Sequence, residues 1–433
     1  MPPQPSRHPL RFANFRSYLV GRLCAVLAQF AMMIVIGWQA YNIARETMGP
    51  QAAAAQLGLI GLSQFVPLFL LTPVTGWVAD HFDRRFIARS TLLLQIGAAT
   101  MLGVATYEGW VSLPMIFGVA MFLGVARAFN GPALSALAPN LVPKEVLPNA
   151  IAISSVAWQS GMIIGPAAGG YAYAIAPWGA YALATGLFIV SLVFLMFIGK
   201  VPQPPRDTSR KPIAQMIDGL SYVRRNRLVL AAITLDLFAV LLAGTTALLP
   251  VYARDILHVG SAGLGHLAAS PAIGAGLTAL ILSVRPMRNE VGLKMLIAVV
   301  VFGLATATFG ATAFLPHVLA MPVALGAMLV WGSADMISVY VRQSLIQLHT
   351  PDEMRGRVSS VSQLTISASN ELGEAESGFL AALIGPVAAV VAGGIGAIVI
   401  TLAWAKLFPE LRLARTFALP DMRTDDPSEE KKA

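Results

Sequence analysis

Long apolar runs, separated by short polar segments, follow one another along almost the whole chain. A membrane-spanning helix needs about 20 predominantly apolar residues, and these runs reach that length. The first run is too long for the apolar core of a signal peptide, so we expect it to be retained. The pattern predicts twelve membrane-spanning helices, near residues 17–43, 56–79, 87–106, 113–137, 149–173, 178–199, 229–252, 263–284, 292–314, 318–341, 358–383 and 386–407.

The composition agrees with a protein that lies in a membrane. Of the 433 residues, 56% are apolar and 12% are charged, whereas soluble domains carry about a quarter charged residues. These values exclude a water-soluble enzyme and a disordered chain. The single cysteine, Cys24, cannot form a disulfide within the chain.

The basic residues lie mainly on one side of the predicted membrane. Of the 30 Lys and Arg residues, 25 fall in segments on the side of the N-terminus, and two, Arg45 and Arg254, fall on the other side. The remaining three, Arg22, Arg127 and Arg342, lie within predicted spans. Because cytoplasmic loops carry an excess of Lys and Arg, we expect a multi-pass membrane protein with both termini in the cytoplasm. The net charge of +8 therefore reflects topology and not nucleic-acid binding.

The longest polar segment divides the predicted helices into two sets of six. We expect an all-α membrane protein with a six-helix bundle at 1–199, a cytoplasmic linker at 200–227, a second six-helix bundle at 228–410 and a cytoplasmic tail at 411–433.

The two halves share a spacing of glycines. An offset of 207 or 208 residues places Gly58 on Gly265 and Gly170 on Gly378. A single offset that serves several helices predicts two pseudo-symmetric, parallel repeats related by an axis along the membrane normal, an arrangement found in some secondary transporters.

Charged residues within the spans are the first candidates for function, because a charge near the middle of the bilayer costs roughly 2.5–3.5 kcal/mol. Glu371 and Glu374 lie one turn apart on one face of the eleventh span, whereas Glu376 points elsewhere. Repulsion in a low dielectric favours protonation of at least one of them, which suits that residue to carry a proton. The alternative is that all three line a wet cavity without a role in coupling.

The other charges within the spans each need a partner or a route to water. Arg127, deep in the fourth span, either steers an anion and helps to couple protons or forms a structural ion pair. Asp236 has no basic residue close in sequence, and we expect it to form the polar part of the transport site with Arg127, Glu371 and Glu374. Arg22 is expected to extend to the cytoplasmic surface. Asp335 and Arg342 share a helical face, which predicts an internal structural ion pair. The expected polar cavity wall comprises Gln29, Trp38 and Gln39.

A short loop after the second span combines small, acidic and basic residues: Gly76, Asp80, Arg84 and Arg85. Gly76 permits close helix approach, and the Asp80 carboxylate could face the N-terminus of a neighbouring helix. Arg84 and Arg85 could pair with it or with lipid headgroups, as in any positive-inside loop.

This loop also resembles the signature loop of the major facilitator superfamily. In that family the Asp and the basic residues act as a cytoplasmic latch between the two halves. Two positions depart from the family pattern, because His81 replaces a basic residue and Asp83 replaces a glycine. These departures affect the expected tight turn but not the latch.

The fifth span contains glycines at every fourth position together with a proline. The repeat makes a flat face for helix packing, and the proline predicts a bend. Close packing of small residues, which is common in membrane helices, would by itself account for this pattern. The segment also resembles the fifth-helix antiporter motif of exporter branches of the same superfamily, which implies export in exchange for protons. Its residues are Gly161, Gly165, Pro166, Gly169 and Gly170.

A closer resemblance covers nearly the full length. Segments 14–16, 248–250, 354–358 and 409–412 are similar to the enterobactin-exporter-like branch of that superfamily, the transmembrane secretion effectors. The resemblance implies the major facilitator fold and a location in a bacterial inner membrane.

The sequence lacks the motifs that nucleotide hydrolysis and metal binding require. The chain has no Gly-x4-Gly-Lys-Ser/Thr phosphate loop, and its six histidines lack metal-ligand spacing. We therefore expect no cofactor, no metal site and no enzyme activity.

The leading hypothesis is a secondary active exporter, by proton antiport and alternating access, of a small amphipathic molecule such as a siderophore or drug. We expect a monomer whose partners are protons, this substrate and the lipid bilayer. An importer or symporter on the same fold is the alternative, against which the glycine-proline helix argues. A membrane receptor or intramembrane enzyme is the third hypothesis, and the lack of a soluble domain or nucleophile argues against it.

Overall fold

The computed structural model describes residues 8–137, 140–143, 146–199 and 212–417, and within these ranges the chain forms helices and no strands. Helices dominate because the hydrocarbon interior of a membrane offers no water to the backbone, so each N–H and C=O must be paired within its own segment.

The N-terminal bundle is formed by six long helices. A short 3-10 helix, η1 (Pro9–Arg11), precedes them. The six are α1 (Ala13–Thr47), α2 (Pro50–His81), α3 (Arg84–Tyr107), α4 (Leu113–Leu137), α5 (Leu147–Ile175) and α6 (Gly179–Met196).

The C-terminal bundle repeats this architecture, with a broken first helix. That segment comprises α8 (Arg227–Leu242), the 3-10 turn η4 (Thr245–Leu248), α9 (Leu249–Val251) and the π-helical turn η5 (Tyr252–Ile256). The following helices are α10 (Gly260–Val284), α11 (Val291–Ala311) with η6 (Thr312–Phe314), α12 (His317–Leu348), α13 (Asp352–Ile384) and α14 (Pro386–Leu407), and the short α15 (Pro409–Arg412) comes last.

The helices begin and end where the sequence supplies suitable residues. The side chains of Asp83 and Asn226 accept hydrogen bonds from backbone N–H groups in the first turns of α3 and α8. Between α13 and α14, Gly385 adopts φ +90°, a conformation that glycine reaches without strain. Pro386 follows as the first residue of α14, where a missing N–H costs nothing.

Eleven described helical stretches are long and apolar enough to cross a membrane. The remaining predicted span, the eleventh at 358–383, corresponds to α13, which has 33 residues but is too polar to qualify by composition. The segment predicted as a linker contains an additional helix, α7 (Pro212–Arg225), which packs against α13.

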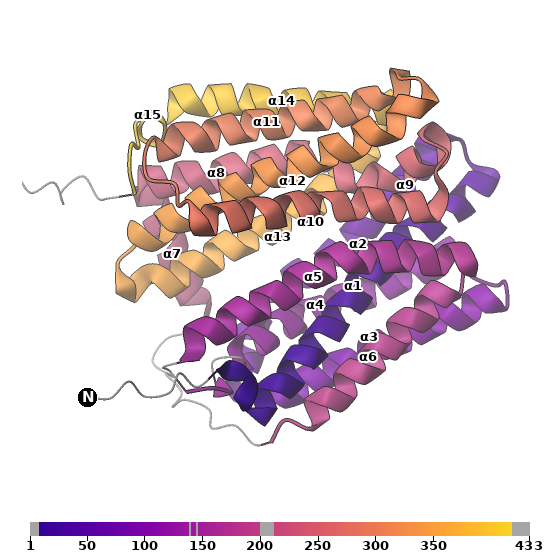
Figure 1. Cartoon of the computed structure of the whole chain (residues 1–433), viewed down its shortest axis with the longest axis horizontal. Helices are drawn as coiled ribbons and strands as arrows, with labels where there is room; N and C mark the ends of the chain where they lie inside the picture. Colours follow the sequence, from indigo (N-terminus) through magenta and orange to yellow (C-terminus); the bar gives the residue numbers. More distant parts are fainter. Residues whose placement is uncertain (1–7, 138–139, 144–145, 200–211, 418–433) are drawn as a thin grey trace, which may run out of the picture.

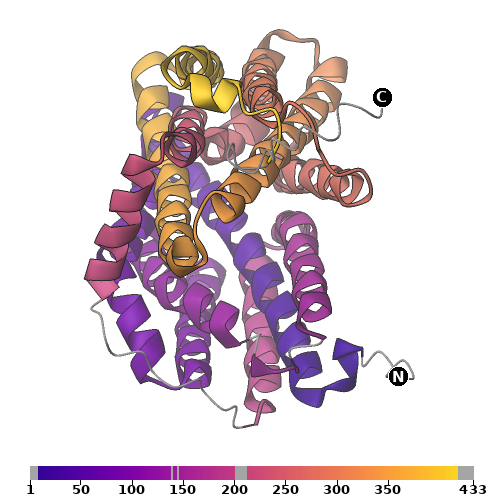
Figure 2. The ribbon, with the colours of Figure 1, turned by 90° about the vertical axis from the view of Figure 1, so that its left-hand side faces the viewer.

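The two bundles lie beside each other, with both ends of the described chain at the same end of the molecule (Figure 1). We call this the terminal end, and the opposite end, which carries α9, the distal end. The view from the terminal end shows the N-terminal helices grouped below the C-terminal ones (Figure 2). The ribbons of the two bundles converge towards the distal end and diverge towards the terminal end (Figure 1).

Two matching pairs of helices join the bundles: α2 contacts α13, and α5 contacts α10. In the first pair Gly58 lies against Gly378, and in the second Gly170 lies against Gly265. The repeat offset relates these four glycines to one another, so the two contacts are equivalent under the pseudo-symmetry. Each lets two backbones approach more closely than a side chain would allow.

Gly378→Ala is expected to destabilise the junction between bundles, because its new Cβ would lie 2.5 Å from the backbone N of Gly58. Overpacking of this kind costs typically about 1–3 kcal/mol, which a thermal unfolding curve in detergent would show. Gly186→Ala is the control, since a Cβ added at Gly186 would meet no atom within 4 Å. An equal or smaller loss at Gly378 than at Gly186 would contradict the close-packing account.

Candidate functional site

An ion pair between the bundles is the central polar feature of the molecule. Arg127, on α4, places Nη1 2.7 Å from Oε1 of Glu371, on α13. The same guanidinium donates a hydrogen bond of 3.0 Å to Oε1 of Gln64, on α2. The Glu371 side chain is only 4% exposed, and its Oε2 has no hydrogen-bond partner among the described residues. The structure therefore holds a buried carboxylate with one oxygen paired and one oxygen free.

The second predicted carboxylate lies next to the first. Thr246 Oγ1 donates a hydrogen bond of 3.4 Å to Oε1 of Glu374. A Cβ at Gly61 would lie 3.2 Å from the Cβ of Glu374, so α2 covers this part of α13 closely. Glu376 instead accepts a weak hydrogen bond from its neighbour Ser377. Glu371 and Glu374 are thus brought together, and Glu376 is separate from them.

The seventh span is broken where it passes these carboxylates, whereas the sequence pattern predicted one continuous helix at 229–252. A Cβ at Gly244 would overlap the backbone of Gly373, so the two segments touch at this point. Pro250 further along lacks the N–H that a continuing helix needs. The break places Thr246 beside Glu374, a contact that the sequence analysis missed because it depends on the local unwinding.

A cavity within the N-terminal bundle adjoins the ion pair. Its polar lining comes from α1, α2, α3 and α4, and Met32, Met33, Ile36, Leu123 and Phe188 form its apolar walls. The polar lining residues are Gln29, Gln64, Gln95 and Arg127. Gln29 therefore lies beside Arg127, as expected for a cavity wall.

Trp38 and Gln39 lie elsewhere in the same bundle. Gln39 is 3% exposed, donates to Thr106 and accepts from Tyr181. Trp38 is 8% exposed and belongs to the apolar core. Neither lines the cavity that contains Gln29, because Gln39 turns towards α3 and α6 and Trp38 packs in the apolar core.

The buried arginine of the C-terminal bundle has a different partner from the predicted one. Arg342 forms an ion pair with Asp236, on α8, and not with Asp335 on its own helix. Both members are almost fully buried, with side-chain exposures of 3% and 6%. The prediction of an Asp335–Arg342 pair is therefore wrong. Asp335 lies two helical turns away from Arg342 on α12, and the packing of α8 against α12 brings the carboxylate of Asp236 closer. Asp236 is therefore held by a cation in this structure.

Arg22, which was expected to extend to the surface, is held inside the N-terminal bundle. Its Nη1 donates to Tyr18 Oη at 2.7 Å, and its guanidinium lies over the rings of Tyr18 and Trp158. Aromatic faces stabilise the cation there.

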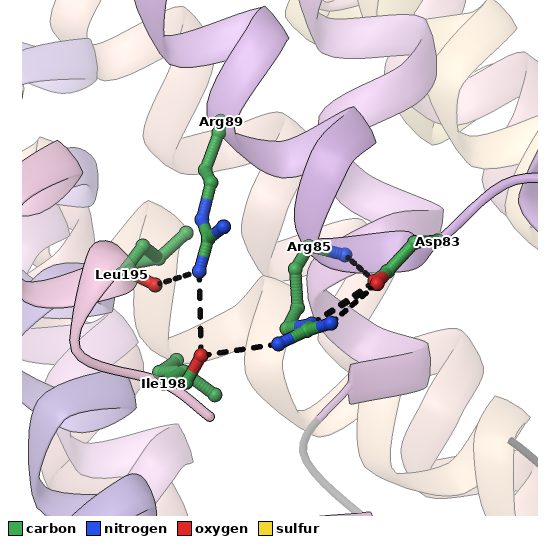
Figure 3. Close-up of polar contacts among 5 residues, drawn as sticks. All are labelled: Asp83, Arg85, Arg89, Leu195 and Ile198. Carbon is green, nitrogen blue, oxygen red and sulfur yellow. Dashed lines mark hydrogen bonds and ion pairs between the residues drawn. The ribbon is translucent and has the colours of Figure 1, made fainter. Parts of the chain in front are cut away.

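The basic residues after α2 bind the end of α6 (Figure 3). Arg85 contacts both carboxylate oxygens of Asp83 and the carbonyl of Ile198, and Arg89 donates to the carbonyls of Leu195 and Ile198. These contacts lie within the N-terminal bundle. The Arg85 guanidinium holds the pKa of Asp83 below its usual range.

Two positions of the predicted latch, Gly76 and Asp80, are outside the residues whose surroundings the structure describes. The latch therefore stays a prediction. Arg84 has a polar partner that is likewise outside the described contacts.

The glycines of α5 divide between two neighbours. Gly161, Gly165 and Gly169 face α1, where an added Cβ would overlap Val26, Phe30 or Ala31. Gly170 instead faces α10 of the other bundle. Pro166 lies inside the helix, as predicted.

A polar cluster joins the bundles at the distal end. Tyr41 Oη and Arg45 Nε approach Oδ2 of Asp255 at 2.6 and 2.9 Å. Arg254 donates to the carbonyl of Asn42 at 3.2 Å. The sequence analysis counted Arg45 and Arg254 only as loop charges. The adjacency of Arg254 and Asp255 in the sequence was the available signal, whereas the approach of Arg45 to Asp255 depends on the fold.

The family-model comparison matches residues 19–374 to the Major Facilitator Superfamily. The chain belongs to the major facilitator superfamily. Enterobactin exporter EntS of Citrobacter koseri is 26% identical over 411 residues, covering 93% of both chains. Enterobactin exporter EntS of Escherichia coli is 26% identical over 417 residues, covering 95% of both.

Solved structures of this superfamily share the fold of the transporter. The inward-open xylose transporter XylE of E. coli matches with a TM-score of 0.66 at 16% identity, over 93% of this chain and 97% of that chain. The nucleoside transporter NupG matches with a TM-score of 0.71 at 12% identity, over 91% and 100%. The predicted fold, two pseudo-symmetric six-helix bundles, is confirmed.

Replacement of Arg127 by Met is expected to destabilise this transporter by about 3–5 kcal/mol, because it leaves the buried carboxylate of Glu371 without a cation. Adding Glu371→Gln should recover part of the loss, which a double-mutant cycle of thermal unfolding would measure. Arg415→Met is the control, since the Arg415–Glu290 pair is exposed and worth about 0–1 kcal/mol. No recovery in the double variant would contradict a direct pair.

Asp83→Ala is expected to cost about 1 kcal/mol through loss of the cap on α3. Because the folded-state pKa of Asp83 is lowered, its contribution is present at neutral pH and is lost as the pH falls below about 4. Unfolding curves of the wild type and the variant should therefore differ at pH 7 and converge in acid. A difference that stays constant down to pH 3 would argue against the charged cap.

Proposed function

We propose that this transporter is a proton-coupled exporter of a small amphipathic molecule, in the range of a siderophore or drug. The observation that carries the proposal is the Arg127–Glu371 pair, which joins the two bundles through one buried carboxylate. Similarity to enterobactin exporters along nearly the whole chain supports export.

Protonation of Glu371 would change the contact between the bundles. A neutral carboxyl group no longer attracts the guanidinium of Arg127, and in a low dielectric that attraction is several times stronger than in water. A hydrogen-bond donor of a substrate in the cavity lined by Gln29, Gln64 and Arg127 would bind the free Oε2 of Glu371 only while that carboxyl group is ionised. Proton and substrate thus compete for the same carboxylate, which is the requirement for exchange.

The terminal end is proposed to face the cytoplasm. Most of the Lys and Arg residues are in segments at this end, as the positive-inside rule requires. The contacts of Asp255 with Tyr41 and Arg45 hold the bundles together at the distal end. Substrate would therefore enter from the cytoplasm in this state and leave after the distal contacts have opened.

Glu371→Gln is expected to abolish export driven by a pH gradient, because glutamine cannot exchange a proton. The purified full-length protein would be placed in proteoliposomes with an imposed pH gradient, with enterobactin and ethidium as separate probes. Glu374→Gln is expected to weaken the dependence on the gradient, since Glu374 lies beside Glu371 at the same junction.

Glu376→Gln is the matched control, because it makes the same chemical change on the same helix away from the junction. Gradient-driven transport by Glu371→Gln at the wild-type rate would contradict the coupling role. Accumulation of a probe in the direction of proton flow would instead establish the importer or symporter alternative.

A further inference from the structure

A row of polar side chains runs along one face of α12. Trp331, Asp335, Ser338 and Arg342 follow one another at spacings of three or four residues, which places them on the same face. Asp335 is 18 residues from the first residue of α12 and 13 from its last. At 1.5 Å per residue these separations are about 27 and 20 Å, so the row crosses the middle of the membrane-spanning region.

Several polar atoms of this row lack a hydrogen bond among the described residues, although Arg342 is paired with Asp236. Nε1 of Trp331, Oγ of Ser338 and Nε of Arg342 are buried without a hydrogen bond. Ser338 is 3% exposed and Arg342 is 2% exposed. The carboxylate of Asp335 makes no hydrogen bond or ion pair with any residue that the structure describes. Each unsatisfied buried group costs about 1–3 kcal/mol, so this row indicates a site that binds something in part of the cycle.

The charges around Asp335 do not balance. Arg342 is paired with Asp236, so these two side chains together are neutral and Asp335 adds one uncompensated negative charge. A metal ion does not fit, because Ca²⁺ or Mg²⁺ requires about six oxygen ligands and one of the two carboxylates already binds a guanidinium. A proton restores neutrality without any additional ligand.

The helices packed against α12 bring no other cation to this depth within the described residues. On α10 the titratable residue is His266, six residues from the distal start of that helix, and on α11 it is Lys294, three residues from its terminal start. On α8 the acid is Asp236, which Arg342 holds. On α13, Glu371 is paired with Arg127 and Glu374 contacts Thr246.

We propose that Asp335 is a second proton-binding residue, in the C-terminal bundle and separate from Glu371, and that Arg342 keeps Asp236 ionised so that the proton goes to Asp335. A proton from water adds to one carboxylate oxygen of Asp335, and the same O–H bond breaks when the site opens to the other side. This inference rests on the proposed proton-coupled function and adds a second proton to each cycle.

Infrared spectroscopy of the purified full-length protein in lipid nanodiscs tests the site directly. A pH titration should show the C=O band of a protonated carboxyl group, and Asp335→Asn should remove one titrating component of it. Asp218→Asn is the control, because Asp218 lies in α7, outside the spans, and is bound to Arg357. If Asp335→Asn does not fold, Asp335→Glu serves instead and should shift the frequency of that component.

Proton counting in proteoliposomes, with enterobactin as the probe, tests the consequence. Asp335→Asn should keep coupled export but move about one proton fewer per molecule, whereas Glu371→Gln should lose coupling altogether. An unchanged carboxyl titration or an unchanged proton count in Asp335→Asn would overturn the proposal. If the wild type moves no protons with the probe, the proposed function fails, and the infrared titration still decides whether Asp335 binds a proton.

Discussion

A charged side chain within a lipid bilayer must be paired, neutralised or hydrated, and the structure satisfies this requirement for Arg127 by means of the opposite bundle. The cation is on α4 and its carboxylate partner, Glu371, is on α13. The two bundles therefore depend on each other electrostatically at the junction between them. The close backbone contacts of α13 with Gly61 and Gly244 surround this pair and position the acidic helix. An ion pair within a single bundle would stabilise that bundle but would not link its charge state to the relative position of the halves.

The two bundles share an architecture and differ in their polar chemistry. The repeat offset relates Gln29 to Asp236 and Arg127 to Asp335, so that an amide and a cation in one half correspond to two carboxylates in the other. The N-terminal bundle has amide groups around one arginine. The C-terminal bundle has the buried Arg342–Asp236 ion pair and additional acids. Pseudo-symmetry thus supplies two equivalent sets of helices, and the unequal side chains give the two halves different polar chemistry.

Contacts near the distal end hold the two bundles together in this structure. Gly58 with Gly378 and Gly170 with Gly265 bring backbones into contact, and Asp255 adds a polar contact with Tyr41 and Arg45. Apolar packing between helices gives little specificity inside lipid, because lipid tails are as apolar as the side chains. The polar cluster therefore fixes the register of the closed end, and the glycines allow the helices to reach it.

The sequence by itself determined where the membrane-spanning helices lie, because the lipid environment requires apolar runs of a set length. The fourth span, for example, was predicted at 113–137, and α4 has these bounds. It also singled out Arg127, Glu371 and Glu374 as candidates, because a charge is expensive in the membrane. Only the tertiary structure decided their partners. Asp236 binds Arg342 across two helices more than 100 residues apart in sequence, and Thr246 reaches Glu374 because the seventh span is broken. Such pairs depend on the rotation and close approach of separate helices, which the apolar periodicity of a single segment does not contain.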